Sequence, residues 1–118
     1  MPRLLLIVAS LALTAGVALA ATPTATVLRI TADPNGAMRF DRSTLRARPG
    51  PVTISMKNPS VVPHNVAIRG NGVKKLGQVV FKGGTSTVSA KLKTGRYVLY
   101  CSVAGHEKAG MKGTLSVK

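Results

Sequence analysis

The chain has very few of the residues from which disulfide frameworks and most protein metal clusters are built. Its 118 residues include one cysteine, two histidines, no tryptophan and three acidic residues. A single cysteine cannot form an internal disulfide, and it excludes a four-cysteine zinc or iron–sulfur site. Two histidines are too few for most all-protein metal clusters but enough for one mixed site. The candidates for chemistry therefore reduce to Cys101, His64, His106 and a few methionines.

The first twenty residues are predicted to be an export signal. Arg3 supplies a positive charge, residues 4–20 are apolar or small, and the segment ends in small residues of the kind that signal peptidase recognises. We predict cleavage before Ala21, with a signal peptide over 1–20 and one folded domain over 21–118. The alternative is an uncleaved membrane anchor, because the apolar segment nearly reaches the length of a membrane span. Both alternatives predict a location outside the cytoplasm, either periplasmic or secreted.

The rest of the chain has the pattern of short β-strands separated by turns. Alternating apolar residues and β-branched side chains mark the strand candidates, with Gly, Pro and Asn between them. The candidates are residues 26–31, 38–41, 45–48, 52–58, 64–69, 78–81, 86–92, 95–100 and 113–117. No ten-residue stretch shows a sustained helical stripe. We therefore predict an all-β, antiparallel Greek-key sandwich of seven to eight strands.

One loop near the C-terminus combines three types of metal ligand. Cys101, His106 and Met111 are spaced as Cys-x4-His-x4-Met. Copper favours this mixture, because a thiolate and imidazoles bind it in a trigonal plane and a weak axial thioether tunes its redox potential. The plane needs a second imidazole, and His64 is the only other histidine in the chain.

Each of these residues also has a structural alternative. Cys101 can be a small buried hydrophobe, and Met111 can simply fill the core. His64, which has apolar neighbours, can be an ordinary core histidine, and His106 an ordinary loop residue. However, an exported chain meets oxidising conditions, where a free thiol is a liability. A lone cysteine in that environment is more often buried, metal-bound or reactive than idle, which favours the copper interpretation.

The residues around these donors resemble the small blue copper proteins of the cupredoxin family. The similar segments are Pro63-His64-Asn65-Val66, Gly95-Arg96-Tyr97-Val98-Leu99-Tyr100-Cys101 and Gly110-Met111-Lys112-Gly113-Thr114-Leu115. They follow the plastocyanin/azurin pattern on both sides of the ligand loop. The loop spacing departs from that of plastocyanin and azurin, and it matches the spacing in rusticyanin-like proteins.

The resemblance implies a role for individual residues. His64, Cys101 and His106 would be the equatorial ligands of one type 1 copper, which alternates between Cu(I) and Cu(II), and Met111 would be the axial ligand. Asn65 resembles the residue that ties the two ligand-bearing loops together by hydrogen bonds, and such partners fix ligand orientation.

Two of the residues would form the electron-transfer surface. In the family, the ligand equivalent to His106 lies at the surface within an apolar patch. Tyr100 matches a tyrosine that offers a second surface route through the adjacent cysteine. Tyr97 can instead be the corner tyrosine of the fold, which is a structural role.

The resemblance implies a single-electron carrier that is not an enzyme. Enzymes related to these proteins need further copper centres with additional histidines. The expected partners of the monomer are redox proteins such as a cytochrome or a terminal oxidase, with an acidic docking surface. Two alternatives remain: a copper-binding module that sequesters copper or delivers it to an oxidase, and a cationic interaction protein without metal.

The positive charge has two interpretations. Lys and Arg number 17 against three acidic residues, which gives a formal net charge of +14. No block of five like charges occurs, which is typical of a charged surface rather than a disordered tail. The surface can steer the protein toward an acidic redox partner, or it can be a solvated surface suited to its compartment. Nucleic-acid binding is disfavoured, because basic patches with stacking aromatic residues are absent and the chain carries an export signal.

Overall fold

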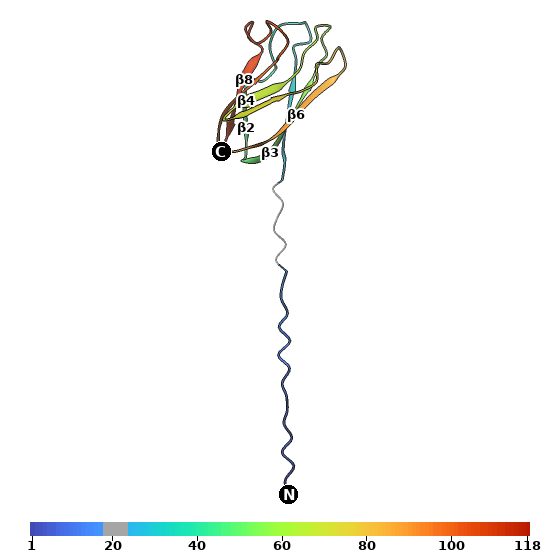
Figure 1. Cartoon of the computed structure of the whole chain (residues 1–118). Helices are drawn as coiled ribbons and strands as arrows, with labels where there is room; N and C mark the ends of the chain where they lie inside the picture. The colour runs from blue at the N-terminus through green and yellow to red at the C-terminus, as the bar shows by residue number, and fades with distance from the viewer. Residues whose placement is uncertain (18–23) are drawn as a thin grey trace.

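The folded part of the chain is an all-β sandwich (Figure 1). The computed structural model describes residues 1–17 and 24–118. Within these ranges the strands are β1 (Thr26–Thr31), β2 (Thr44–Ala47), β3 (Gly50–Lys57), β4 (Ala67–Gly70), β5 (Val73–Leu76), β6 (Thr85–Leu92), β7 (Gly95–Tyr100) and β8 (Lys112–Val117). The predicted fold class, an all-β sandwich of seven to eight strands, is confirmed.

The N-terminal segment is separate from the strands. Residues 1–17 form neither helix nor strand. No helix in the described residues has the length and apolar character needed to cross a membrane. The predicted cleavage before Ala21 lies outside the described residues, so the extent of the signal peptide stays a prediction.

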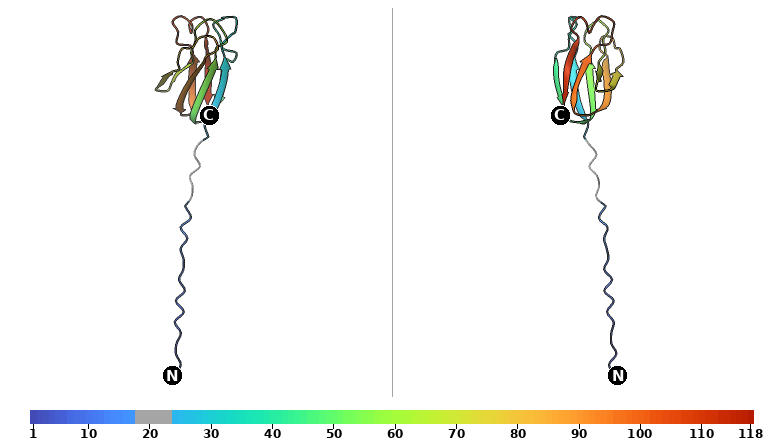
Figure 2. Two further views of the ribbon diagram at one scale, coloured as in Figure 1. Left: turned by 90° about the vertical axis from the view of Figure 1, so that its right-hand side faces the viewer. Right: turned by 60° about the vertical axis from the view of Figure 1, so that its left-hand side comes forward.

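The strands form two sheets that pack face to face (Figure 2). One has the order β1-β3-β6 and the other β2-β8-β7-β4-β5. Alternate residues point inward, because successive side chains of a strand lie on opposite faces. Ile54, Met56, Ile68, Leu99 and Leu115 are among the fully buried side chains of the core between the sheets.

Two pairings depart from the antiparallel arrangement that the sequence suggested. β1 pairs with β3 in parallel, and β2 pairs with β8 in parallel. Parallel neighbours need a crossover connection rather than a tight turn. The chain supplies one between β1 and β3 by placing β2 in the opposite sheet.

Most strand boundaries agree with the residue alternation, but two candidates do not form strands. β1 and β7 have the predicted bounds. Residues 38–41 and 78–81 instead contribute one isolated bridge each, Phe40 with Ala32 and Val80 with His64. Because each segment pairs with a neighbour at one residue only, its apolar pattern does not lead to a strand.

The structure adds one strand that the sequence did not predict. β5 has the sequence Val-Lys-Lys-Leu, lies at the edge of its sheet and pairs with β4. Asn71 and Gly72 join the two strands, with φ angles of 48° and 81°. Positive φ at both positions is the requirement of a two-residue hairpin turn, which Asn-Gly satisfies best. Lysines on an edge strand also discourage pairing with another chain.

The strand ends bring the predicted ligands to one end of the sandwich. β7 ends at Tyr100, immediately before Cys101, and β8 begins directly after Met111. The two strands pair along their whole length, and the Cys101 amide donates to the Met111 carbonyl at 3.1 Å. His64 precedes β4, where its bridge with Val80 holds the backbone. At the other end of β7, the Tyr97 hydroxyl donates to the Lys93 carbonyl at 2.8 Å, in the manner of a corner tyrosine.

Candidate metal centre

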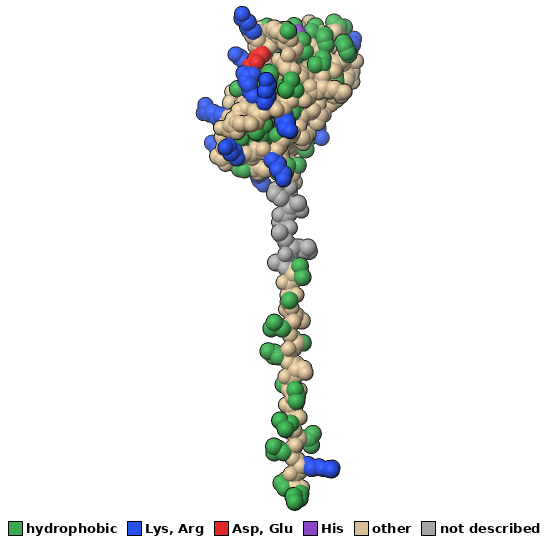
Figure 3. Space-filling view, in the orientation of Figure 1, with side chains coloured by type: hydrophobic (Ala, Val, Ile, Leu, Met, Phe, Trp, Pro, Cys, Tyr) green, Lys and Arg blue, Asp and Glu red, His purple; other side chains and the backbone are tan. Residues whose placement is uncertain are grey.

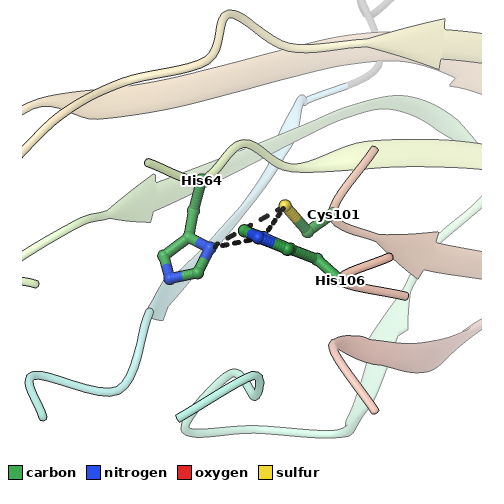
Figure 4. Close-up of side chains that lie close together, drawn as sticks. All are labelled: His64, Cys101 and His106. Atoms are coloured by element: carbon green, nitrogen blue, oxygen red, sulfur yellow. Dashed lines mark hydrogen bonds between the residues drawn. The ribbon is translucent and has the colours of Figure 1, made fainter. Parts of the chain in front are cut away.

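Three donor atoms converge at this end of the sandwich, one from His64 and two from the C-terminal loop that follows β7 (Figure 4). The Nδ1 atoms of His64 and His106 lie 3.1 Å apart. The Cys101 Sγ lies 3.5 Å from Nδ1 of His106 and 3.9 Å from Nδ1 of His64. The fold therefore brings together the three residues that the sequence predicted as equatorial ligands.

This triangle has the size that a metal ion requires. Bonds of about 2.0 Å to nitrogen and about 2.3 Å to sulfur, arranged in a plane, separate the donors by about 3.5 to 4 Å. The three observed separations are close to that value. Two imidazoles and a thiolate are also soft donors, which favour copper over magnesium or calcium. The residues present therefore fit a mononuclear copper ion.

His64 has the surroundings of a ligand rather than of a packing residue. It is fully buried, and its Nδ1 faces Nδ1 of His106 and Sγ of Cys101. A buried histidine whose ring nitrogen faces a second imidazole and a thiol has the position of a metal ligand. Burial, followed by the charge of His106, lowers the pKa of His64. A lowered pKa keeps the imidazole neutral, which is the form that binds metals.

Cys101 is fully buried, and its sulfur has one polar contact from the backbone. The Asn65 amide donates a hydrogen bond to Sγ at 3.5 Å. This bond holds the sulfur against the backbone of the residue that follows His64.

Asn65 connects the two ligand-bearing segments. Its Nδ2 donates to the Ser102 hydroxyl at 2.8 Å and to the Gly77 carbonyl at 3.0 Å. The Ser102 amide donates back to Oδ1 of Asn65 at 2.7 Å. Asn65 follows His64 and Ser102 follows Cys101, so these bonds fix the position of one ligand relative to the other.

Met111 lies at the base of the ligand loop. It is fully buried and belongs to the same cluster of buried side chains as Cys101. Its amide donates to the His106 carbonyl at 3.1 Å, and its carbonyl accepts from the Cys101 amide. The backbone of Met111 is thus bonded to both His106 and Cys101, in the region where the axial ligand was predicted.

The two residues predicted to form an electron-transfer surface differ in exposure. His106 is half-buried. Tyr100 has an exposed fraction of only 6%, because the guanidinium of Arg69 covers its ring at 4.4 Å from the centroid. The expectation that Tyr100 itself lies at the surface is therefore wrong, since a cation–π contact places another side chain over it.

Arg69 and Glu107, which were not among the predicted site residues, form an ion pair beside the site. Hydrogen bonds from Arg69 are the largest cause of the lowered pKa of Glu107, and the same bonds raise the pKa of Arg69. One signal could have found this pair. Glu107 is one of only three acidic residues, and it directly follows His106.

The sequence and the fold both match known copper proteins. The model of the copper-binding proteins of the plastocyanin/azurin family matches residues 27–118, which is most of the chain. Solved structures with a similar fold include a reduced auracyanin from Roseiflexus castenholzii, the "blue" copper protein auracyanin A from Chloroflexus aurantiacus and an azurin from Methylomonas sp. strain J.

These structures are similar over nearly their whole length, although the sequences have diverged. Their sequence identities to the chain are 22%, 21% and 16%, and their TM-scores are 0.68, 0.69 and 0.65, in the same order. The similarity covers 79%, 80% and 79% of this chain, and 97%, 100% and 98% of the respective structures.

Proposed function

Because the chain belongs to the plastocyanin/azurin family of copper-binding proteins, we propose that it is a small blue copper protein that carries single electrons between redox partners. The observation that carries this proposal is the convergence of His64, Cys101 and His106, whose ligand atoms all lie within 4.8 Å of one another. These residues would bind copper in a plane, and Met111 would be the weak axial ligand. Bound there, copper supplies a one-electron couple.

The protein holds these ligands in a geometry that changes little. The paired strands β7 and β8 fix Cys101 and Met111, and the hydrogen bonds of Asn65 fix His64 relative to Cys101. Burial of three of the four donors excludes water, while half-buried His106 provides an edge for contact with a partner. A rigid site suits both oxidation states, so an electron crosses without a large rearrangement.

We infer that the protein is a carrier rather than an enzyme. Both histidines of the chain belong to this one centre. A second copper centre of the kind that oxidases use would need further imidazoles. The proposed chemistry is therefore limited to accepting and giving one electron.

The charge distribution supports a partner with an acidic docking surface. All three carboxylates of the chain have internal partners: Asp33 pairs with Arg39, Glu107 pairs with Arg69, and Asp41 accepts a backbone hydrogen bond. Lys and Arg side chains stand out over the visible face of the sandwich, where acidic atoms are scarce (Figure 3). Such a surface steers an acidic partner, and added salt should slow that association.

We further propose that the protein works as a monomer outside the cytoplasm, in the periplasm or secreted. The apolar segment over 4–20, with the positive charge of Arg3, supports an N-terminal signal peptide that ends before Ala21. Residues 21–118 would then be the copper-binding domain.

A copper titration tests the proposal most directly. Cu(II) is added to the purified protein, and visible absorption and electron paramagnetic resonance are recorded. An intense blue band with narrow copper hyperfine splitting at one equivalent is expected. A pale product would show that the four donors do not form a type 1 site. Unchanged thermal stability after copper addition would instead favour a cationic interaction protein, because a ligand of the native state must stabilise it.

Rates separate an electron carrier from a copper-delivery module. A carrier exchanges electrons rapidly with a cytochrome and retains its copper throughout. A delivery module surrenders copper to an acceptor within the assay. The burial of His64, Cys101 and Met111 favours retention.

A further inference from the structure

The ligand loop, defined as residues 102–110, is shaped mainly by hydrogen bonds within itself. The His106 amide donates to the Val103 carbonyl, the Ala109 amide to Gly105, and the Gly110 amide to Glu107, at 2.9 to 3.1 Å. Such bonds give the loop its form. They do not attach it to the sandwich.

Few hydrogen bonds attach the far part of this loop to the rest of the protein. Ser102 is held by Asn65 at the start of the loop, and the end of the loop bonds to the adjoining residues of β8. Val103 packs against the core at the start of the loop. In the described part of the chain, residues 103–110 otherwise form polar contacts with the sandwich through only two side chains. One is the imidazole of His106, and the other is the carboxylate of Glu107.

The contact of Glu107 with Arg69 has the geometry of a strong ion pair. Nη1 of Arg69 donates to Oε1 at 2.7 Å, and Nη2 donates to Oε2 at 2.5 Å. Two parallel, charge-assisted bonds fix direction as well as distance. The side chains are 41% and 30% exposed, so water screens the pair only in part.

Arg69 also contacts the strand that leads to the cysteine. Its guanidinium covers the ring of Tyr100, the residue before Cys101. Arg69 itself lies on β4, which follows the segment that carries His64 and pairs with β7. One side chain thus links the three chain segments that carry His64, Cys101 and His106.

We propose that Arg69 is a positioning residue that clamps the ligand loop to the sandwich and so holds His106 in place. This rests on the proposed function in taking the loop as a copper-binding loop. The clamp acts together with the imidazole contacts of His106 and the packing of Val103, which also attach residues 103–110 to the described sandwich. With copper bound, the clamp slows the loop opening through which the metal is lost.

A lysine could not replace Arg69 fully. An ammonium group supplies a point charge, but it lacks the fork that bonds both oxygens of Glu107 and the plane that stacks on Tyr100. Arg69→Lys should therefore retain part of the effect, whereas Arg69→Met should lose it.

The test measures amide hydrogen exchange in the metal-free protein and copper loss to a chelator in the copper-loaded protein. In Arg69→Met, exchange of the Met111 amide, which bonds the base of the loop to the His106 carbonyl, should rise about threefold to tenfold, and copper loss should accelerate similarly. Glu107→Gln should behave likewise, and Arg69→Lys should be intermediate. Arg39→Met, which breaks the ion pair with Asp33, is the matched control and should change neither quantity.

Exchange protection of β3 and β6 shows in each case whether the variant has folded. If Arg69→Met does not fold, Glu107→Gln tests the same contact from the loop side. Loop exchange and copper loss that match the wild type in a folded variant would overturn the clamp. If the substitutions accelerate loop exchange but the copper-loaded wild type gives no blue spectrum, the proposed function is contradicted and the clamp still stands.

Discussion

Asn65 and Ser102 are joined by two hydrogen bonds that run in opposite directions. Nδ2 of Asn65 donates to the Ser102 hydroxyl at 2.8 Å, and the Ser102 amide donates to Oδ1 of Asn65 at 2.7 Å. Because one residue follows His64 and the other follows Cys101, the pair sets the spacing of two ligands that are distant in sequence. Hydrogen bonds within the protein thus fix the position of His64 relative to Cys101.

Asn65→Ala should destabilise the protein and loosen the site. The substitution leaves the partly buried Ser102 amide and Gly77 carbonyl without the partners they have here, which costs about 1–2 kcal/mol in the free energy of unfolding. Urea unfolding and the rate of copper loss measure the two effects. Asn35→Ala, at an exposed turn, is the control, and an equally small change in both variants would contradict the prediction.

Gly77→Ala should be as damaging, for a steric reason. A Cβ atom at this position would lie 2.6 Å from the Val66 carbonyl oxygen and 2.7 Å from the Ser86 hydroxyl. Relief requires movement of the backbone that also accepts the Asn65 side chain. We expect a loss of about 2 kcal/mol or more in the free energy of unfolding, measured in urea. A loss below about 0.5 kcal/mol would show that the backbone yields easily.

Cys101→Ser should abolish the blue colour. The intense band comes from charge transfer between the thiolate and copper, and a hydroxyl cannot supply it. The substitution nearly preserves volume, so the metal-free protein should fold, as circular dichroism can verify. A variant that remained blue would overturn the assignment of Cys101 as a ligand.

Met111→Leu should keep the colour and raise the reduction potential. Leucine fills a similar volume in the core, so the expected cost in stability is below about 1.5 kcal/mol. The thiolate remains, whereas the weak axial thioether that tunes the potential is removed. Voltammetry on the wild type and the variant gives the comparison. A large fall in potential would show that Met111 is not the axial ligand.

Acid should weaken the turn that Asp33 organises. Hydrogen bonds from the Arg39 side chain, and then from the Asn35 amide, lower the pKa of Asp33 in the folded state. A lowered folded-state pKa means that the contribution to stability is complete above the ordinary pKa of about 4 and is lost as the pH falls below it. The free energy of unfolding of Asp33→Asn should therefore decline less than that of the wild type between pH 5 and pH 2, measured in urea.

The local sequence predicts most of the strands but not which strands pair with one another. Alternation gave the bounds of β1 and β7, because inward and outward side chains differ in polarity along a half-buried strand. It missed β5, since a short edge strand with two lysines has little apolar signal, although Asn71-Gly72 marked its turn. It also gave no sign that β2 pairs with β8, because that partner lies far along the chain.

The sequence by itself determined the chemistry of this protein: Cys-x4-His-x4-Met and one further histidine provide a donor set that suits copper. Only the tertiary structure decided that the donors of His64, Cys101 and His106 meet within 4.8 Å. It also decided that Arg69 covers Tyr100 and binds Glu107. Donor type is a property of individual side chains and can be read locally. The distances between the donors and the contact of Arg69 with Tyr100 depend on which strands become neighbours. Burial of the whole core decides which strands do so.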